Sequence, residues 1–200
     1  MKTFLAIDFG TSQTSVAMLA ENSRYEPEIV EIDGQKAIPT ALRLDAEGNV
    51  LFFGKDAIER FHDDAGQTFY NFKAFIGRNK DYQAMTGQTT YTPEALSLTF
   101  LTYLREKIEK RYFNGATLAD DPNISCVIGC PAEWNDPQKR KVEDIARQAG
   151  FPNVVHCEEP LGVIYYYHFR GDLDLSEDRN VLVYDFGGGT TDVAIEKVRT

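Results

Sequence analysis

The sequence predicts an α/β fold in which mixed β-sheets are flanked by helices. In the second half of the chain, β-rich segments at residues 124–130, 154–157 and 181–186 alternate with helical patterns. Such alternation requires crossover connections and helices that cover a sheet. The first half instead holds short strands separated by turns. Together these two observations indicate a sheet of mixed strand direction.

Taken in order, the first part of the chain reads as strands. The predicted strands are residues 2–8, 12–19, 28–32, 37–44 and 50–53. Residues 54–64 are expected to form a helix, with Ala57, Ile58 and Phe61 on its apolar side. Residues 68–78 are aromatic and basic, and residues 79–90 form a polar, turn-rich excursion.

Helices dominate the predictions that follow. Thr92 can cap the clearest helix and Pro93 suits its first position. Its apolar stripe is Leu98, Leu101, Leu104, Ile108 and Tyr112, and it should end near Asn114 and Gly115. Asp136 and Pro137 begin a second helix, whose buried stripe is Val142, Ile145, Ala146 and Ala149 and whose stop is Gly150. A helix over 161–169 and a hairpin over 181–198 complete the chain.

Composition limits the classes of partner. The net charge of −10 over 200 residues argues against nucleic acid and anionic membranes, because both select a basic surface. No apolar run approaches the roughly 20 residues that span a bilayer. The three cysteines form no C-x-x-C pair, which favours reduced thiols in a cytoplasmic protein.

Two glycine-containing turns are the main functional signal. Asp8-Phe9-Gly10-Thr11-Ser12 follows one apolar strand, and Asp185-Phe186-Gly187-Gly188-Gly189-Thr190-Thr191-Asp192 follows another. Glycines leave backbone N–H groups uncovered, and such groups form anion sites that commonly hold phosphate. The phosphate-binding candidates are Gly10, Thr11, Ser12, Gly187, Gly188, Gly189 and Thr190.

Each turn begins with an aspartate. Mg²⁺ is usually held by one or two carboxylates together with water and phosphate oxygens, so Asp8 and Asp185 are candidate magnesium residues, acting through water. The structural alternative is that each aspartate only starts a turn and each glycine only tightens a hairpin. The pairing of two such turns, and three glycines in a row, favour one shared nucleotide.

Three further segments accompany these turns. They are Phe72-Lys73-Ala74-Phe75-Ile76-Gly77-Arg78, Ile128-Gly129-Cys130-Pro131-Ala132-Glu133-Trp134 and Glu158-Glu159-Pro160. With the two turns, in this order, they make the chain resemble the nucleotide-binding domain of the DnaK-type heat-shock chaperones, within the actin, sugar-kinase and heat-shock ATPase superfamily. The resemblance covers nearly all 200 residues.

This resemblance implies a fold, an architecture and a cofactor. The fold would be a ribonuclease-H-like, actin-like ATPase lobe that binds ATP or ADP with Mg²⁺. Residues 1–200 would form the first lobe, with subparts 1–120 and 121–200, while the second lobe and a peptide-binding region would lie outside this chain. The implied partners are nucleotide, these missing regions, co-chaperones and client proteins.

The resemblance also assigns roles to four residues. Lys73 would reach the γ-phosphate and the attacking water, and Glu159 would orient water and metal, with Asp8 and Asp185 organising the metal. Taken alone, Lys73 reads as a surface charge and Glu159 as an acid at a helix start. Pro131 matches a proline that relays nucleotide state, and Lys139 stands where the family has an arginine, a departure because lysine and arginine are not interchangeable.

Two other functions remain open at this point. One is a metabolite kinase of the same superfamily, which would need a substrate pocket and a catalytic-base aspartate. The other is an actin-like filament protein or an inactive regulatory scaffold. A slowly hydrolysing chaperone ATPase, in which hydrolysis acts as a conformational switch, is the function that the Lys73 and Glu159 segments favour.

Overall fold

The computed structural model describes residues 2–21, 26–63, 66–78, 80–83, 90–119, 121–188 and 191–199. Its main sheet has the strand order β11-β10-β1-β2-β3, with β4 also paired to β2. These strands are β1 (Thr3–Phe9), β2 (Gln13–Ala20), β3 (Glu28–Ile29), β4 (Ala37–Pro39), β10 (Ile124–Cys130) and β11 (Val154–Glu158). β1 runs parallel to β10 and antiparallel to β2, so the sheet is mixed, as the sequence predicted.

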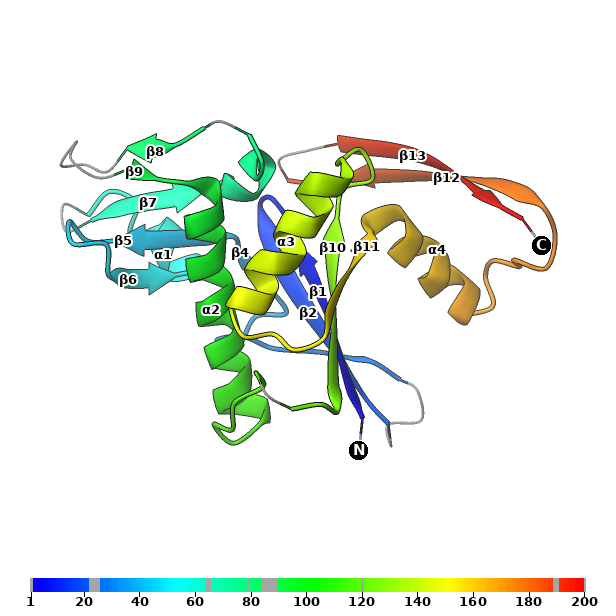
Figure 1. The fold of residues 1–200 in the computed structure, drawn as a ribbon, viewed down its shortest axis with the longest axis horizontal. Helices are drawn as coiled ribbons and strands as arrows, with labels where there is room; N and C mark the ends of the chain where they lie inside the picture. Colours follow the sequence, from blue (N-terminus) through cyan, green and yellow to red (C-terminus); the bar gives the residue numbers. More distant parts are fainter. Residues whose placement is uncertain are drawn as a thin grey trace.

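Two helices cover one face of this sheet, α2 (Pro93–Tyr112) and α3 (Asp136–Gln148) (Figure 1). Alternate residues of a strand point to opposite faces, and Leu5, Ile7 and Phe9 of β1 are at most 1% exposed. The Phe9 ring stacks on Phe100 of α2 with centroids 5.8 Å apart. Phe4, on the other face, is 44% exposed, so the principal core lies between the sheet and α2 and α3.

The sequence predicted both of these helices with small errors. Thr92 caps α2 by accepting from the Ala95 N–H, and Pro93 is its first residue. Leu101, Leu104 and Ile108 are buried as predicted, but Leu98 and Tyr112 are only partly buried. The fully buried Leu96 and Phe100 were missed, because the predicted stripe was centred one helical row away from the true buried face.

The start of α3 lies one residue earlier than predicted. Asn135, rather than Asp136, is the N-cap. Its side chain accepts a hydrogen bond from the backbone N–H of Gln138 at 3.0 Å. In return, the side-chain oxygen Oε1 of Gln138 accepts from the backbone N–H of Asn135 at 3.3 Å. This reciprocal pair is a capping box. Val142, Ile145, Ala146 and Ala149 are buried, and Gly150 has φ +90°, both as predicted.

A second, three-stranded sheet lies beyond α2 in Figure 1, in the order β6-β5-β7. It comprises β5 (Ala41–Leu44), β6 (Val50–Phe53) and β7 (Gln67–Tyr70). The single strand predicted at 37–44 is therefore wrong: it divides at Thr40 into β4 and β5, in different sheets. Thr40 causes the division, since its N–H donates to the Ser12 carbonyl and its hydroxyl donates to the Gly10 carbonyl.

The helix predicted at 54–64 is also wrong in length. The helix α1 spans only Lys55–Glu59, and only Ala57 is buried, while Ile58 and Phe61 are 42% and 47% exposed. The buried guanidinium of Arg43 donates to the backbone carbonyls of Phe61 and Asp63. Because these two carbonyls accept from Arg43, a helix that continued through residues 61–63 is not formed.

The excursion predicted at 79–90 falls largely outside the described residues. Its described ends form a short antiparallel pair, β8 (Tyr82–Gln83) with β9 (Thr90–Tyr91). The basic aromatic segment before it contains the 3₁₀ helix η1 (Phe72–Phe75). Phe72 is fully buried, with its ring 6.0 Å from Phe100 of α2.

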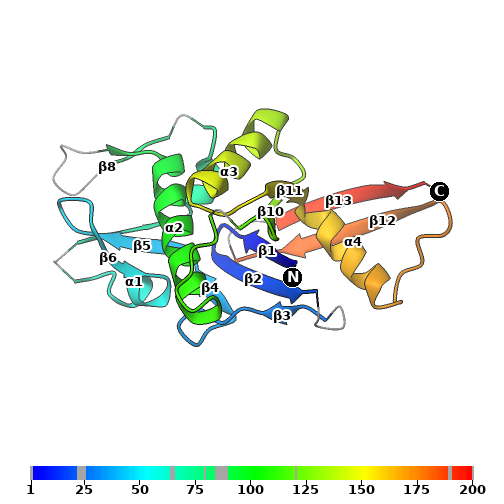
Figure 2. The ribbon, with the colours of Figure 1, turned by 60° about the horizontal axis from the view of Figure 1, so that its bottom comes forward.

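The last hairpin is separate from the main sheet. β12 (Arg179–Phe186) and β13 (Thr191–Val198) pair only with each other among the described strands. The prediction that strand 181–186 would join strands 124–130 and 154–157 is therefore wrong. β12 instead pairs with β13 along its whole length, from Arg179 opposite Val198 to Phe186 opposite Thr191, because strands joined by a short connection can pair as an antiparallel hairpin. Figures 1 and 2 show this hairpin extending away from the main sheet beside α4 (Glu159–Phe169).

One face of this hairpin is apolar and exposed. Leu182 pairs with Ile195 and Tyr184 with Val193, which places their side chains on one face. All four are at least 60% exposed, and Phe186 beside them is 77% exposed.

In the part of the chain that the structure describes, no helix is both long and apolar enough to cross a membrane.

Candidate functional site

The first glycine turn joins β1 to β2 and follows Asp8. A Cβ atom on Gly10 would lie 2.2 Å from the Gln13 carbonyl oxygen, so this tight turn accepts only glycine. Thr40 stabilises this turn with two hydrogen bonds. Its hydroxyl donates to the Gly10 carbonyl at 2.8 Å, and its N–H donates to the Ser12 carbonyl at 2.9 Å. The turn is thus held in one shape by a residue distant in sequence.

The second glycine turn lies directly against the first. Asp185 and Asp192 face each other at the end of the β12–β13 ladder. A Cβ atom on Gly188 would lie 3.2 Å from the Ser12 Cβ, so a side chain here would press on the first turn. Gly189 and Thr190, both predicted phosphate ligands, lie outside the described residues.

Both turns open into one cleft of about 530 Å³. The predicted site residues that line it are Asp8, Gly10, Thr11, Ser12, Lys73, Glu159, Asp185, Gly187 and Gly188. Every predicted site residue that the structure describes therefore faces the same space. Segments from both ends of the chain meet here because β1 and β12 carry the two turns to one place.

Lys73 lies on η1 and is buried, with 2% of its side chain exposed. Its ammonium nitrogen Nζ is 2.6 Å from Oε1 of Glu159. The rings of Phe9 and Trp134 lie on either side, with centroids 5.9 and 5.7 Å from Nζ. Aromatic faces attract a cation at such distances, so these contacts hold a positive charge at the floor of the cleft.

The segment that follows Lys73 is fixed by two helices. Glu94 of α2 accepts from the Gly77 N–H at 2.9 Å, and the Gln138 side chain of α3 donates to the Ile76 carbonyl at 3.1 Å. Gly77 has φ +73°, and a Cβ there would lie 2.9 Å from the Gln138 Cγ. Glycine is therefore required where α3 meets the Lys73 segment.

Glu159 is the first residue of α4 and reaches back over β10. A Cβ atom on Gly129 of β10 would lie 3.4 Å from the Glu159 Cγ and 3.8 Å from its Oε1. The missing side chain at Gly129 thus leaves the space that the Glu159 carboxylate occupies. This contact between α4 and β10 was not predicted from the sequence.

The electrostatics of the cleft are dominated by carboxylates. Desolvation by the surrounding protein atoms is the main cause that raises the pKa of Glu159. The charge of Lys73 lowers this pKa, and the charges of Asp8 and Asp185 raise it. Desolvation also raises the pKa of Asp8, although this residue keeps an exposed surface, and Asp185 adds to the rise while Lys73 opposes it. Three acids and one lysine therefore act on one another across the cleft.

This arrangement suits a magnesium–phosphate ligand. Asp8 and Asp185 line one cleft and repel each other, and a cation between them relieves that repulsion. Among the described residues, no group of three or more His, Cys, Asp or Glu side chains could enclose a metal ion. Two carboxylates together with water and phosphate oxygens are the ligand set that Mg²⁺ prefers, so the residues present fit this ion.

Several cleft residues were missed as site residues. They are Gln13, Arg78, Glu133, Trp134 and Phe186. Arg78, Glu133 and Trp134 belong to segments that carried the family resemblance, so position within those segments was the available signal. Pro131 and Asp192 also line the cleft. Lys139 does not line it and instead pairs with Glu158.

Comparison with known proteins gives consistent relatives. The chain is 33% identical over 96% of its length to the chaperone protein DnaK of Halobacterium salinarum. It is 30% identical over 97% of its length to the chaperone protein HscA homolog of Bordetella petrii, and 29% identical over 99% to the chaperone protein dnaK of Cyanophora paradoxa. The chain spans 28%, 32% and 33% of the lengths of the Halobacterium, Bordetella and Cyanophora proteins.

A family profile agrees with these relatives. The profile described as Hsp70 protein matches residues 82–200, a segment that includes Glu159 and the second glycine turn. The five resembling segments and the mixed sheets flanked by helices extend the agreement to the rest of the chain. The chain belongs to the Hsp70 protein family.

Proposed function

We propose that this chain is the nucleotide-binding part of a Mg²⁺-dependent chaperone ATPase that hydrolyses ATP as a conformational switch. The observation that carries the proposal is the convergence of two glycine turns, two aspartates and the Lys73–Glu159 pair on one cleft. Magnesium, when bound with ATP, would supply charge neutralisation for the phosphates, and Asp8 and Asp185 would hold it through water.

The residues of the chain would share the remaining work. N–H groups and hydroxyls of residues 10–12, with N–H groups of Gly187 and Gly188, would hold the phosphate oxygens. Lys73 would place its charge against the oxygens of the γ-phosphoryl group, where negative charge develops. The carboxylate of Glu159 would accept a hydrogen bond from the attacking water.

In the reaction, the water oxygen bonds to the γ-phosphorus and the bond from that phosphorus to the bridging oxygen of ADP breaks. The proton lost by water passes to solvent. The burial of the Lys73–Glu159 pair, with 2% and 21% of the two side chains exposed, supports this role, because charges act more strongly where water is excluded.

The test uses the full-length protein. Phosphate release from ATP should require magnesium, and Lys73→Ala should slow single-turnover hydrolysis by about a hundredfold or more. Lys110→Ala is the matched control, since Lys110 is an exposed lysine near the end of α2 and does not line the cleft. Absence of magnesium-dependent turnover in the wild-type protein, or an unchanged rate in Lys73→Ala, would contradict the proposal.

The two other functions considered from the sequence are not favoured, because the relatives are named chaperones. A panel of sugars and related metabolites tests for a kinase, and nucleotide-dependent sedimentation tests for a filament. Chaperone action further predicts that full-length protein binds an unfolded polypeptide more weakly with ATP than with ADP. Identical affinity in both nucleotide states would remove the switch from the proposal.

A further inference from the structure

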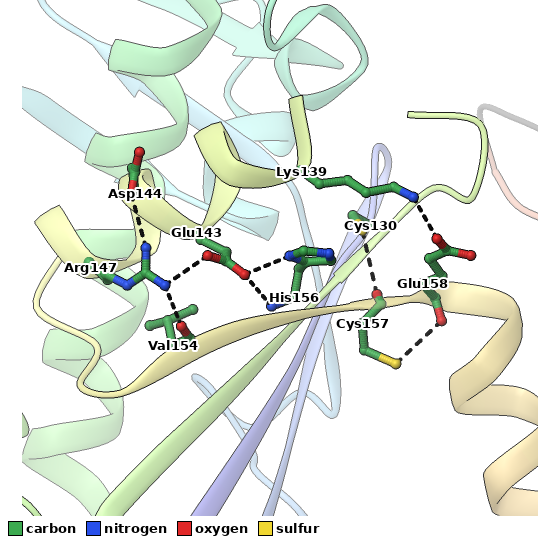
Figure 3. A network of polar contacts seen from close by, with 9 residues as sticks. All are labelled: Cys130, Lys139, Glu143, Asp144, Arg147, Val154, His156, Cys157 and Glu158. Carbon is green, nitrogen blue, oxygen red and sulfur yellow. Dashed lines mark hydrogen bonds and ion pairs between the residues drawn. The ribbon is translucent and has the colours of Figure 1, made fainter. Parts of the chain in front are cut away.

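A second buried ion pair lies beside the cleft. Nζ of Lys139, on α3, is 2.5 Å from Oε1 of Glu158 at the end of β11 (Figure 3). Lys139 as a residue is 8% exposed, and 31% of the Glu158 side chain is exposed. The hydrogen bond from Lys139 to Glu158 is the main cause that raises the pKa of Lys139. The Lys139 ammonium is therefore charged and forms an ion pair with the Glu158 carboxylate.

Glu158 directly precedes Glu159, at the junction of β11 and α4. It is the N-cap of α4, yet its side chain makes no capping hydrogen bond. The carboxylate that would ordinarily hold the helix start is instead drawn to Lys139 on α3. Glu158 ends β11 and Glu159 begins α4, so the Lys139–Glu158 pair ties the backbone directly before Glu159 to α3.

The two ion pairs form one group around Cys130. Glu158 lies opposite Cys130 in the register of β10 and β11. Burial is the main cause that raises the pKa of the Cys130 thiol to about 11, and the charges of Lys139, Glu159, Lys73 and Glu158 also act on it. The charges of two lysines and two glutamates therefore act on one buried thiol.

We propose that Glu158, anchored by Lys139, is a positioning residue that holds the Glu159 carboxylate against Lys73. This inference rests on the proposed function, since it concerns how the hydrolytic pair is aligned. Loss of the Glu158 charge frees the start of α4 to rotate, and the Glu159 carboxylate then leaves its contact with Lys73. A displacement of about 1 Å in a reacting group can cost a large factor in rate.

The experiment measures single-turnover hydrolysis and nucleotide affinity in the full-length protein. Glu158→Gln, which keeps the side-chain shape, should slow hydrolysis by about tenfold while ATP affinity changes less than about twofold. In a Glu159→Gln background, Glu158→Gln should have almost no further effect, because the group that it positions is already lost. An equal slowing in both backgrounds would overturn the proposal.

A structural role gives a different pattern. It would lower the melting temperature and leave the rate constant of the folded molecules unchanged, and that outcome also overturns the proposal. Exchanging the partners, as Lys139→Glu with Glu158→Lys, should restore part of the lost rate. Lys110→Met, at an exposed position of α2, is the matched control and should change neither rate nor affinity.

A crystallographic measurement separates this inference from the proposed function. In Glu158→Gln the Glu159 carboxylate should move away from Nζ of Lys73 or take more than one conformer, whereas Lys110→Met should keep the contact at 2.6 Å. If wild-type protein fails to hydrolyse ATP, the proposed function fails but this comparison still decides the positioning role. An unchanged Lys73–Glu159 contact in Glu158→Gln would overturn it.

Discussion

The ionised carboxylates of Asp8 and Glu159 lower the free energy of unfolding. Asp8 and Glu159 are carboxyls whose pKa is raised chiefly by desolvation, and each is repelled by neighbouring acids. A carboxyl with a raised pKa binds protons more readily in the folded than in the unfolded state, so its ionised form destabilises the fold at neutral pH. Lys73 offsets only part of this effect. The arrangement favours a bound cation over the empty cleft.

Asp8→Asn should therefore stabilise the chain while impairing magnesium-dependent binding. The expected gain in the free energy of unfolding at neutral pH is about 0.5 kcal/mol, a value reduced for the exposed surface of Asp8. The gain should be complete above the folded-state pKa of Asp8. It should shrink as the pH falls through the folded-state pKa and vanish only below the unfolded-state pKa, because Asp8 is then protonated in both states. Denaturant titrations at several pH values measure it, and a gain that grows on acidification would contradict the assignment.

Gly129 should behave as the space for the Glu159 carboxylate. Gly129→Ala places a Cβ 3.4 Å from the Glu159 Cγ, an ordinary contact, and should change hydrolysis less than about threefold. Gly129→Val adds two methyl groups there and should slow hydrolysis by about tenfold or more. Valine favours strands, so thermal unfolding should show little loss. Equal rates in the two variants would show that Glu159 does not depend on this space.

Among the elements, α3 has the strongest link between local sequence and the cleft. Its capping box fixes where the helix begins, and the same Gln138 that completes the box also bonds the Ile76 carbonyl near Lys73. The next residue, Lys139, pairs with Glu158. The start of this helix therefore holds two sides of the site.

Asn135→Ala should remove the cap and lower the free energy of unfolding by about 1 kcal/mol. Gln148→Ala, at an exposed position near the other end of α3, should change it by less than about 0.5 kcal/mol. Chemical denaturation of both variants gives the comparison. A loss in Asn135→Ala no larger than in Gln148→Ala would mean that the capping box contributes little to the fold.

Sequence patterns predicted the ends of an element where residues adjacent in the sequence determine them. The starts of α2 and α3 were predicted to within a residue because a capping side chain followed by proline is a local signal. The division of strand 37–44 at Thr40 and the early end of α1 were not predicted. Both result from hydrogen bonds to residues distant in sequence, from Thr40 to the first glycine turn and from Arg43 to carbonyls 61 and 63.

For the whole molecule, the central question is how the nucleotide is divided between this chain and the rest of the protein. The relatives are about three times longer than the chain, and the cleft gathers the groups that we propose to bind phosphate and magnesium. The family resemblance also implies an adenosine-binding loop in the second lobe, which we propose lies outside residues 1–200. The described cleft would then supply the phosphate end of the site.

The isolated chain should accordingly bind Mg²⁺–ATP at least about tenfold more weakly than the full-length protein. Mg²⁺–tripolyphosphate, which lacks adenosine, should bind the two forms within about threefold of each other. Isothermal titration gives both affinities, after circular dichroism has verified that the isolated chain is folded. Equal ATP affinities would mean that the adenosine site lies within residues 1–200.

The sequence by itself determined the family, the two glycine turns and the identity of the charged residues, since these depend on which residues follow one another. The tertiary structure decided which of them meet. It paired Lys73 with Glu159 and Lys139 with Glu158, opened the space at Gly129, and left β12 and β13 outside the main sheet. These outcomes depend on packing between segments far apart in the chain, where a contact of 3 Å is set by the fold and leaves no periodic trace in the sequence.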